Sequence, residues 1–175
     1  MGLPTSYMTS VKRIPDIFDS IQSAKAPDTF SIRFLEALGF KSKGDRLIIG
    51  VLKDLNFLDS SGKATPDYFE YLDQSQSQKV MAGAIRNAWS DLFAVNVNAQ
   101  NISKAEFVGK LKTLSQGQLS DRVIDNHFMT FSALTKLGDF SEKREKKTVD
   151  VPLKTEKDDL HNLMLKKICL EILIV

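Results

Sequence analysis

Apolar residues recur every three or four positions along most of the first 140 residues, and this spacing predicts a chain built mainly of α-helices. The clearest apolar stripes predict helices over residues 10–24, 29–38, 45–55, 78–93 and 121–137. A shorter helix is expected to begin at Pro66, because proline is favoured in the first turn of a helix. Another is expected after Ser103, where Ser-x-x-Glu fits a capping box. Hydroxyl side chains are expected to cap the first and last long helices at Thr9 or Ser10 and at Ser120.

Residues 56–65 interrupt the helical pattern. Two short apolar segments flank a turn that contains Asp59 and Gly62, which predicts a small β-hairpin. A helix, a glycine-containing turn, a second helix and a hairpin follow one another from about residue 29, and this is the order of a winged helix-turn-helix unit. A shorter helix, a turn at Gly117 and a longer helix repeat part of this order over residues 103–140, which predicts a second helix-turn-helix-like unit.

These patterns divide the chain into four segments. The first is an N-terminal helix over residues 1–26, and the second is the winged-helix unit over residues 27–73. The third, residues 74–140, holds the long helix and the second helix-turn-helix-like unit. The fourth, residues 141–175, begins with a charged linker and ends in an apolar tail that fits a helix or a strand.

The winged-helix order suggests binding to double-stranded DNA, since such a unit places its second helix in the major groove. The side chains expected to face DNA lie in the turn, on the outer face of the second helix and at the hairpin tip: Lys41, Ser42, Lys43, Arg46, Gly50, Lys53 and Lys63. The basic residues would meet base edges and phosphates, Ser42 would bind a phosphate, and Gly50 would allow close approach of the helix. A homodimer is expected, because one small module gives limited affinity.

Charge narrows this hypothesis. The chain has 24 Lys and Arg against 22 Asp and Glu, so its net charge of +2 excludes a polycation that coats nucleic acid. Asp45, Asp54 and Asp59 stand among the basic candidates and would repel phosphate, and charged residues opposite an apolar stripe are typical of any solvated helix. The alternative function is therefore a protein-docking adaptor or scaffold that uses the same faces or the C-terminal tail.

Signatures of an enzyme, a cofactor site or a metal site are missing from the sequence. It contains no glycine-rich phosphate loop and no His-Glu-x-x-His, and its histidines are His127 and His161. Cys169 is the only cysteine, which excludes an intramolecular disulfide or a thiolate zinc cage. We therefore expect no catalytic residues, no metal and no cofactor. A pocket that holds His127 with a carboxylate would favour an enzyme instead.

A cytoplasmic protein without a membrane span is also expected. The N-terminus has no basic region followed by an apolar one, so no secretory signal is visible. The longest apolar run is residues 168–175, interrupted by Glu171, and it falls well short of the roughly 20 residues that a span needs.

Five local motifs resemble an uncharacterised prokaryotic family that is known as a domain of unknown function. They are Tyr7-Met8-Thr9-Ser10, Phe34-Leu35-x-x-Leu38-Gly39-Phe40, Asp45-Arg46 with Val51-Leu52-x-x-Leu55, Leu58-Asp59 followed by Thr65-Pro66-x-Tyr68, and Ile85-Arg86-x-Ala88-Trp89-x-Asp91-Leu92-Phe93. The resemblance covers about residues 5–140. It implies a helical, winged-helix-like fold and supplies no activity. The sequence after His161 departs from the alternating strand that the resemblance implies, which indicates either a truncated end or a terminal helix docked on the core.

Overall fold

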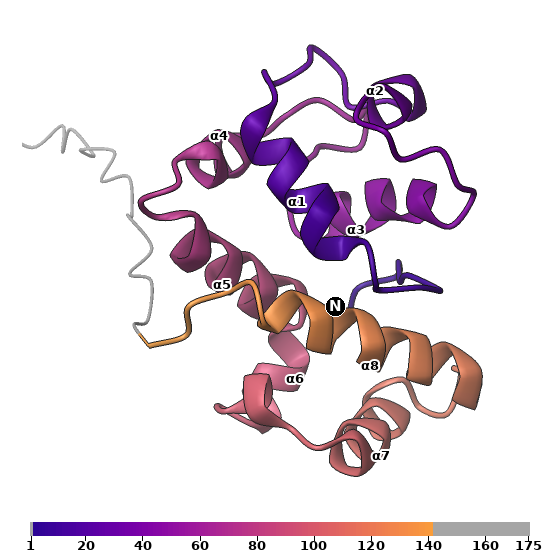
Figure 1. The fold of residues 1–175 in the computed structure, drawn as a ribbon. Coiled ribbons are helices and arrows are strands. Elements are labelled where there is room, and N and C mark those ends of the chain that lie inside the picture. Colours follow the sequence, from indigo (N-terminus) through magenta and orange to yellow (C-terminus); the bar gives the residue numbers. More distant parts are fainter. Residues whose placement is uncertain (1, 142–175) are drawn as a thin grey trace, which may run out of the picture. The chain divides into compact units, whose positions relative to one another are not determined.

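The computed structural model describes residues 2–141 of the chain, drawn in colour in Figure 1. These residues form eight α-helices and two short 3₁₀-helices: α1 (Ile14–Ser23), α2 (Ile32–Ala37), η1 (Asp45–Leu47), α3 (Ile48–Asp54), α4 (Pro66–Leu72), α5 (Ser77–Ala88), α6 (Ser90–Val95), η2 (Ala99–Asn101), α7 (Lys104–Leu114) and α8 (Asp121–Thr135). The prediction of a mainly α fold is confirmed for this part of the chain. The predicted charged linker and apolar tail lie outside the described residues.

Side-chain caps start four of the helices. Hydroxyl oxygens of the N-cap residues accept hydrogen bonds from amides three positions later at Ser31, Thr65, Ser103 and Ser120. The caps predicted at Ser103 and Ser120 are thus confirmed. The cap predicted at Thr9 or Ser10 is wrong: α1 begins only at Ile14, and its N-cap residue Arg13 makes no side-chain cap. The start of α1 is marked instead by a proline in its first turn, because the fixed φ of proline already suits a helix.

The long helix predicted over residues 78–93 is divided at Trp89. α5 ends at Ala88 and α6 begins at Ser90, while Trp89 itself has φ −105° and ψ 36°, away from helical values. The indole of Trp89 is buried with its ring centroid 5.2 Å from that of Phe131. Neither glycine nor proline stands at the break, and the apolar residues keep their helical spacing across it. Local sequence signals therefore do not predict the break.

The hairpin predicted over residues 56–65 is reduced to one isolated antiparallel bridge, between Leu58 and Ala64, and residues 2–141 contain no strand. A longer ladder does not form because backbone amides of the first arm are used elsewhere. The amides of Phe57 and Leu58 donate to the carbonyl of Leu52 near the end of α3, at 2.9 and 3.3 Å. Two backbone hydrogen bonds still cross the turn, from the Asp59 amide to the Lys63 carbonyl at 2.9 Å and from the Thr65 amide to the Phe57 carbonyl at 3.0 Å. We refer to this segment as the α3–α4 loop.

Local hydrogen bonds hold the α3–α4 loop tightly closed. Asp59 Oδ1 accepts from the amides of Ser61 and Lys63 at 2.8 and 3.0 Å, and Gly62 adopts a φ of +87° that favours glycine. The Phe30 amide donates to the Gly62 carbonyl at 2.8 Å. The loop is therefore fixed against the chain segment that leads into α2.

The hydrophobic core runs through the described helices without a gap. α1 packs on α4 and α8, α5 packs on α4 and α8, and α7 covers α8 (Figure 1). Near α8, the ring of Phe131 lies against those of Trp89, Phe93 and Phe107, with centroids 5.2–6.2 Å apart. This core fixes the elements that carry the candidate site.

Candidate functional site

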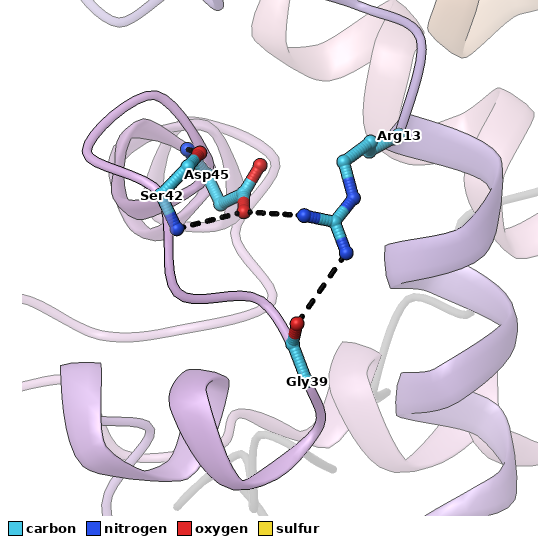
Figure 2. Close-up of polar contacts among 4 residues, drawn as sticks. All are labelled: Arg13, Gly39, Ser42 and Asp45. Carbon is cyan, nitrogen blue, oxygen red and sulfur yellow. Dashed lines mark hydrogen bonds and ion pairs between the residues drawn. The ribbon is translucent and has the colours of Figure 1, made fainter.

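A polar network ties the start of α1 to the turn between α2 and α3 (Figure 2). Asp45 Oδ2 accepts from Arg13 Nη1 at 3.0 Å and from the Ser42 amide at 3.1 Å. In return, Ser42 Oγ accepts from the Asp45 amide at 3.1 Å. Arg13 Nη2 also donates to the Gly39 carbonyl at 3.4 Å. These bonds fix the conformation of residues 39–45, which carry three of the candidate residues.

Arg13 is 26 positions from Gly39 and 32 positions from Asp45 along the chain. Its role therefore has no signal in the sequence. Its guanidinium stands over the ring of Phe40, 4.6 Å from the centroid, which adds a cation–π contact. The Asp45 side chain is only 7% exposed, whereas that of Arg13 is 47% exposed. The buried carboxylate is thus neutralised by a residue that sequence analysis did not select.

The predicted DNA-binding lysines of the turn and loop are open to solvent. Lys41, Lys43 and Lys63 are exposed, and their side chains have no hydrogen bond or ion pair within the part of the chain that the structure describes. Arg46 pairs with Glu36 at 3.0 Å, and Lys53 Nζ donates to the Ser60 carbonyl at 2.8 Å. Exposed ion pairs of this kind contribute about 0–1 kcal/mol, so Glu36 holds Arg46 only weakly.

Ser42 and Gly50 have partners inside the protein. The Ser42 hydroxyl accepts from the Asp45 amide, as described above. A Cβ added at Gly50 would lie 2.6 Å from Ser6 Oγ and 2.9 Å from Ser6 Cβ. The close approach that the missing side chain of Gly50 permits is therefore made by the protein's own N-terminal segment.

That segment, residues 2–9, is held down along its length, and we refer to it as the N-terminal strap. Gly2 N donates to Asp91 Oδ2 at 3.0 Å, and the Asp91 amide donates back to the Gly2 carbonyl at 3.3 Å. The Met8 amide donates to Thr130 Oγ1 at 2.8 Å, and the Met8 side chain is buried. Each hydrogen bond contributes about 1 kcal/mol and burial of one methionine about 2 kcal/mol, so the strap is a firm part of the folded surface.

The acidic residues near the basic candidates are also engaged. Asp54 Oδ2 accepts from the Ser6 amide at 2.7 Å. Asp59 is exposed, and hydrogen bonds from Ser61 and from the Lys63 amide lower the pKa of its carboxyl group. Asp59 thus stays ionised beside Lys63, while Asp45 is buried and paired with Arg13.

A shallow depression of about 420 Å³ separates the strap from the start of α3. Its lining combines hydroxyl groups, one guanidinium and one apolar side chain: Thr5, Ser6, Tyr7, Thr9, Arg46, Leu47 and Gly50. Of the sequence-predicted site residues, the depression brings together Arg46 and Gly50. Neither His127 nor a carboxylate lines it, so it is not the pocket that would favour an enzyme.

Comparison with known proteins adds one assignment. The model of a family of unknown function, DUF5343, matches residues 6–145. The chain belongs to DUF5343. No curated protein and no solved structure matches it. The resemblance inferred from the five motifs is thereby confirmed as membership of a family of unknown function, and the DUF5343 match includes the turn network, α3 and the second half of the strap.

Within residues 2–141, no group of three or more histidine, cysteine or acidic side chains is placed to hold a metal ion. In the same residues, every helix is too short or too polar to cross a membrane.

His127 of the DUF5343 chain lies inside the molecule behind the strap. It is 3% exposed, and its ring centroid is 5.0 Å from that of Tyr7, in an edge-to-face arrangement. Desolvation lowers the pKa of its imidazole below the usual 6.5, and the negative charge of Asp54 opposes part of this shift. Because its imidazole contacts the ring of Tyr7, His127 packs directly against the strap.

Acidification should destabilise the protein through His127. The pKa of a histidine that is depressed in the folded state is higher in the unfolded chain, so the unfolded state binds more protons and stability falls as the pH falls. The loss begins as the pH drops below about 6.5 and ends below the lower folded-state pKa. Urea unfolding at several pH values between about 7 and 5 should show a steeper decline for wild type than for His127→Gln. Parallel curves for the two proteins would contradict the buried, neutral imidazole.

Proposed function

We propose that this DUF5343 chain is a non-enzymatic protein that binds double-stranded DNA through a winged-helix-like unit. In this proposal, η1 and α3 meet the major groove, and the α2–α3 turn and the α3–α4 loop meet the flanking phosphates. One observation carries it: basic side chains on these consecutive elements are exposed, and the acidic side chains of the same elements are buried, paired or hydrogen-bonded. The exposed basic residues are Lys41, Lys43, Arg46, Lys53 and Lys63.

The arrangement of the elements supports the winged-helix part of the proposal. α2, the turn, α3 and the closed α3–α4 loop follow in the expected order. The hydrogen bonds from Leu58 to the Leu52 carbonyl and from Phe30 to the Gly62 carbonyl hold the loop beside α3 and the segment that leads into α2, as a wing would be held. Lys63 projects from this loop and Lys53 from α3, and contacts from two such elements fix the register of a protein on a duplex.

The charges support phosphate as the main contact. Lys41, Lys43 and Lys63 give up no ion pair within residues 2–141 when they bind an anion. Each phosphate that a lysine or arginine neutralises releases counterions, so binding should weaken linearly on a log–log plot against salt. The proposal also includes a cytoplasmic location and a homodimer, since one module of this size makes few contacts.

Fluorescence anisotropy with a mixed-sequence duplex tests the proposal. We expect wild type to bind at low salt and to weaken steeply toward physiological salt. Arg46→Ala/Lys53→Ala should bind at least tenfold more weakly, with a log–log slope smaller by about 2, because two phosphate contacts are lost. The matched control is Arg122→Ala/Lys136→Ala, which removes one exposed arginine from α8 and one exposed lysine directly after it. Equal weakening in both variants would show that affinity depends on the overall charge of the protein and not on this surface. That result would contradict the proposal.

The second candidate function is docking of a partner protein at the same surface. The observation that favours it is the apolar side chain of Leu47, which is 38% exposed in the depression beside Arg46. Leu47→Asp should then abolish capture of a partner. A chain that binds no duplex at low salt and loses its partner on this substitution would establish the adaptor function.

A further inference from the structure

The depression between the N-terminal strap and α3 carries the chemistry of an anion site. Arg46 supplies a guanidinium, and the strap supplies the hydroxyl groups of Thr5, Ser6 and Thr9. Arginine and hydroxyl side chains are common donors to DNA phosphates. Ser6 already lies against Gly50, whereas Thr5 and Thr9 are exposed. The donors around this hollow are thus two exposed hydroxyls and one guanidinium, which Glu36 holds at 3.0 Å.

The strap brings its hydroxyls to both α3 and the α2–α3 turn. A Cβ at Gly50 would be 2.6 Å from Ser6 Oγ, and a Cβ at Gly44 would be 3.7 Å from Thr9 Oγ1. The hydrogen bonds of Ser6 to Asp54 and of Met8 to Thr130 fix the strap at this position. A duplex that approaches α3 therefore meets the strap as well, and the strap belongs to the contact surface.

We propose that this depression binds one phosphodiester group of the DNA backbone, with Arg46 and the hydroxyls of Thr5 and Thr9 as donors. This inference rests on the proposed function. Within that function it assigns Arg46 to the DNA backbone, as a phosphate clamp, and not to base edges. Glu36 holds the Arg46 guanidinium at 3.0 Å in the free protein and is the group that the phosphate replaces.

Removing the hydroxyls tests the strap half of the site without changing any charge. In the anisotropy assay at fixed salt, Thr5→Val/Thr9→Val should bind the duplex about tenfold more weakly than wild type, with an unchanged salt slope. Thr113→Val/Thr135→Val on α7 and α8 is the matched control and should bind as wild type does. Protection of the Ser6 and Met8 amides from hydrogen exchange should be the same in wild type and Thr5→Val/Thr9→Val, which shows that the strap is still docked.

Removing the competitor tests the arginine half. Glu36→Gln should strengthen binding about threefold more than Glu106→Gln, because both remove one exposed carboxylate but only Glu36 holds Arg46. Wild-type binding by both the Thr5→Val/Thr9→Val variant and the Glu36→Gln variant would overturn the phosphate site. Salt-dependent binding that Arg46→Ala/Lys53→Ala weakens would still support the proposed function in that case. Absence of any binding by wild type at low salt would overturn both.

Discussion

Replacing Phe131 with alanine should lower the free energy of unfolding by about 3–5 kcal/mol, the largest effect of any substitution considered for this chain. Phe131 is 1% exposed on α8, and its ring contacts those of Trp89 and Phe107 with centroids 5.2 and 5.4 Å away. Truncation removes a large buried apolar surface and leaves a cavity between α5, α7 and α8, which relaxation closes only in part. Urea denaturation followed by circular dichroism measures the change.

The matched control for Phe131 is Met129→Ala on the same helix. Met129 is 38% exposed, so its removal should change the free energy of unfolding by less than about 1 kcal/mol. A loss below about 1 kcal/mol in Phe131→Ala would mean that this aromatic cluster does not form the core around α8.

The second large effect should come from Asp45→Ala. It removes the acceptor for both Arg13 and the Ser42 amide, which should destabilise the fold by about 1–3 kcal/mol. The half-exposed Arg13 recovers hydration, so the loss stays below that of a fully buried pair. The same variant should bind DNA several-fold more weakly, although removal of a negative charge by itself favours phosphate. We expect weaker binding because loosening of the turn that carries Lys41 and Lys43 outweighs the gain from removing that charge.

Asp28→Ala serves as the control for Asp45, because Asp28 is exposed and has no side-chain partner within residues 2–141. Its stability should be unchanged, and its DNA affinity should rise slightly because one negative charge is removed. A double-mutant cycle of Arg13→Gln with Asp45→Asn isolates the pair and should give a coupling of about 1 kcal/mol. Stronger DNA binding by Asp45→Ala than by wild type would show that the turn network does not position the site.

Local sequence rules predicted the helices well where each signal acts within one turn. The capping hydroxyls of Ser103 and Ser120 and the proline that opens α4 mark true helix starts. The rules were wrong where tertiary contacts decide. Trp89 turns inward to the core and divides the long helix, and Leu52 takes the amides that a hairpin would need.

The candidate site shows the same limit. The basic residues of the turn, α3 and the loop could be selected because their charge and spacing are visible in the sequence. Arg13 and the strap could not, since Arg13 meets Asp45 across 32 positions and Met8 meets Thr130 across 122. The Gly50 signal was present, but the sequence does not say which surface comes close to a glycine.

The span between Met8 and Thr130 also bears on how the chain is made. Synthesis proceeds from the N-terminus at about 5–20 residues per second, and domains begin to fold as they are completed. After α4 is made, about 60 further residues must be added before Thr130 exists, which takes about 3–12 s. Throughout that interval α1 to α4 exist, but the Thr130 hydroxyl that accepts from the Met8 amide does not. The side of the strap that is buried in the folded protein is therefore exposed on the ribosome. This interval is when a chaperone has access to it.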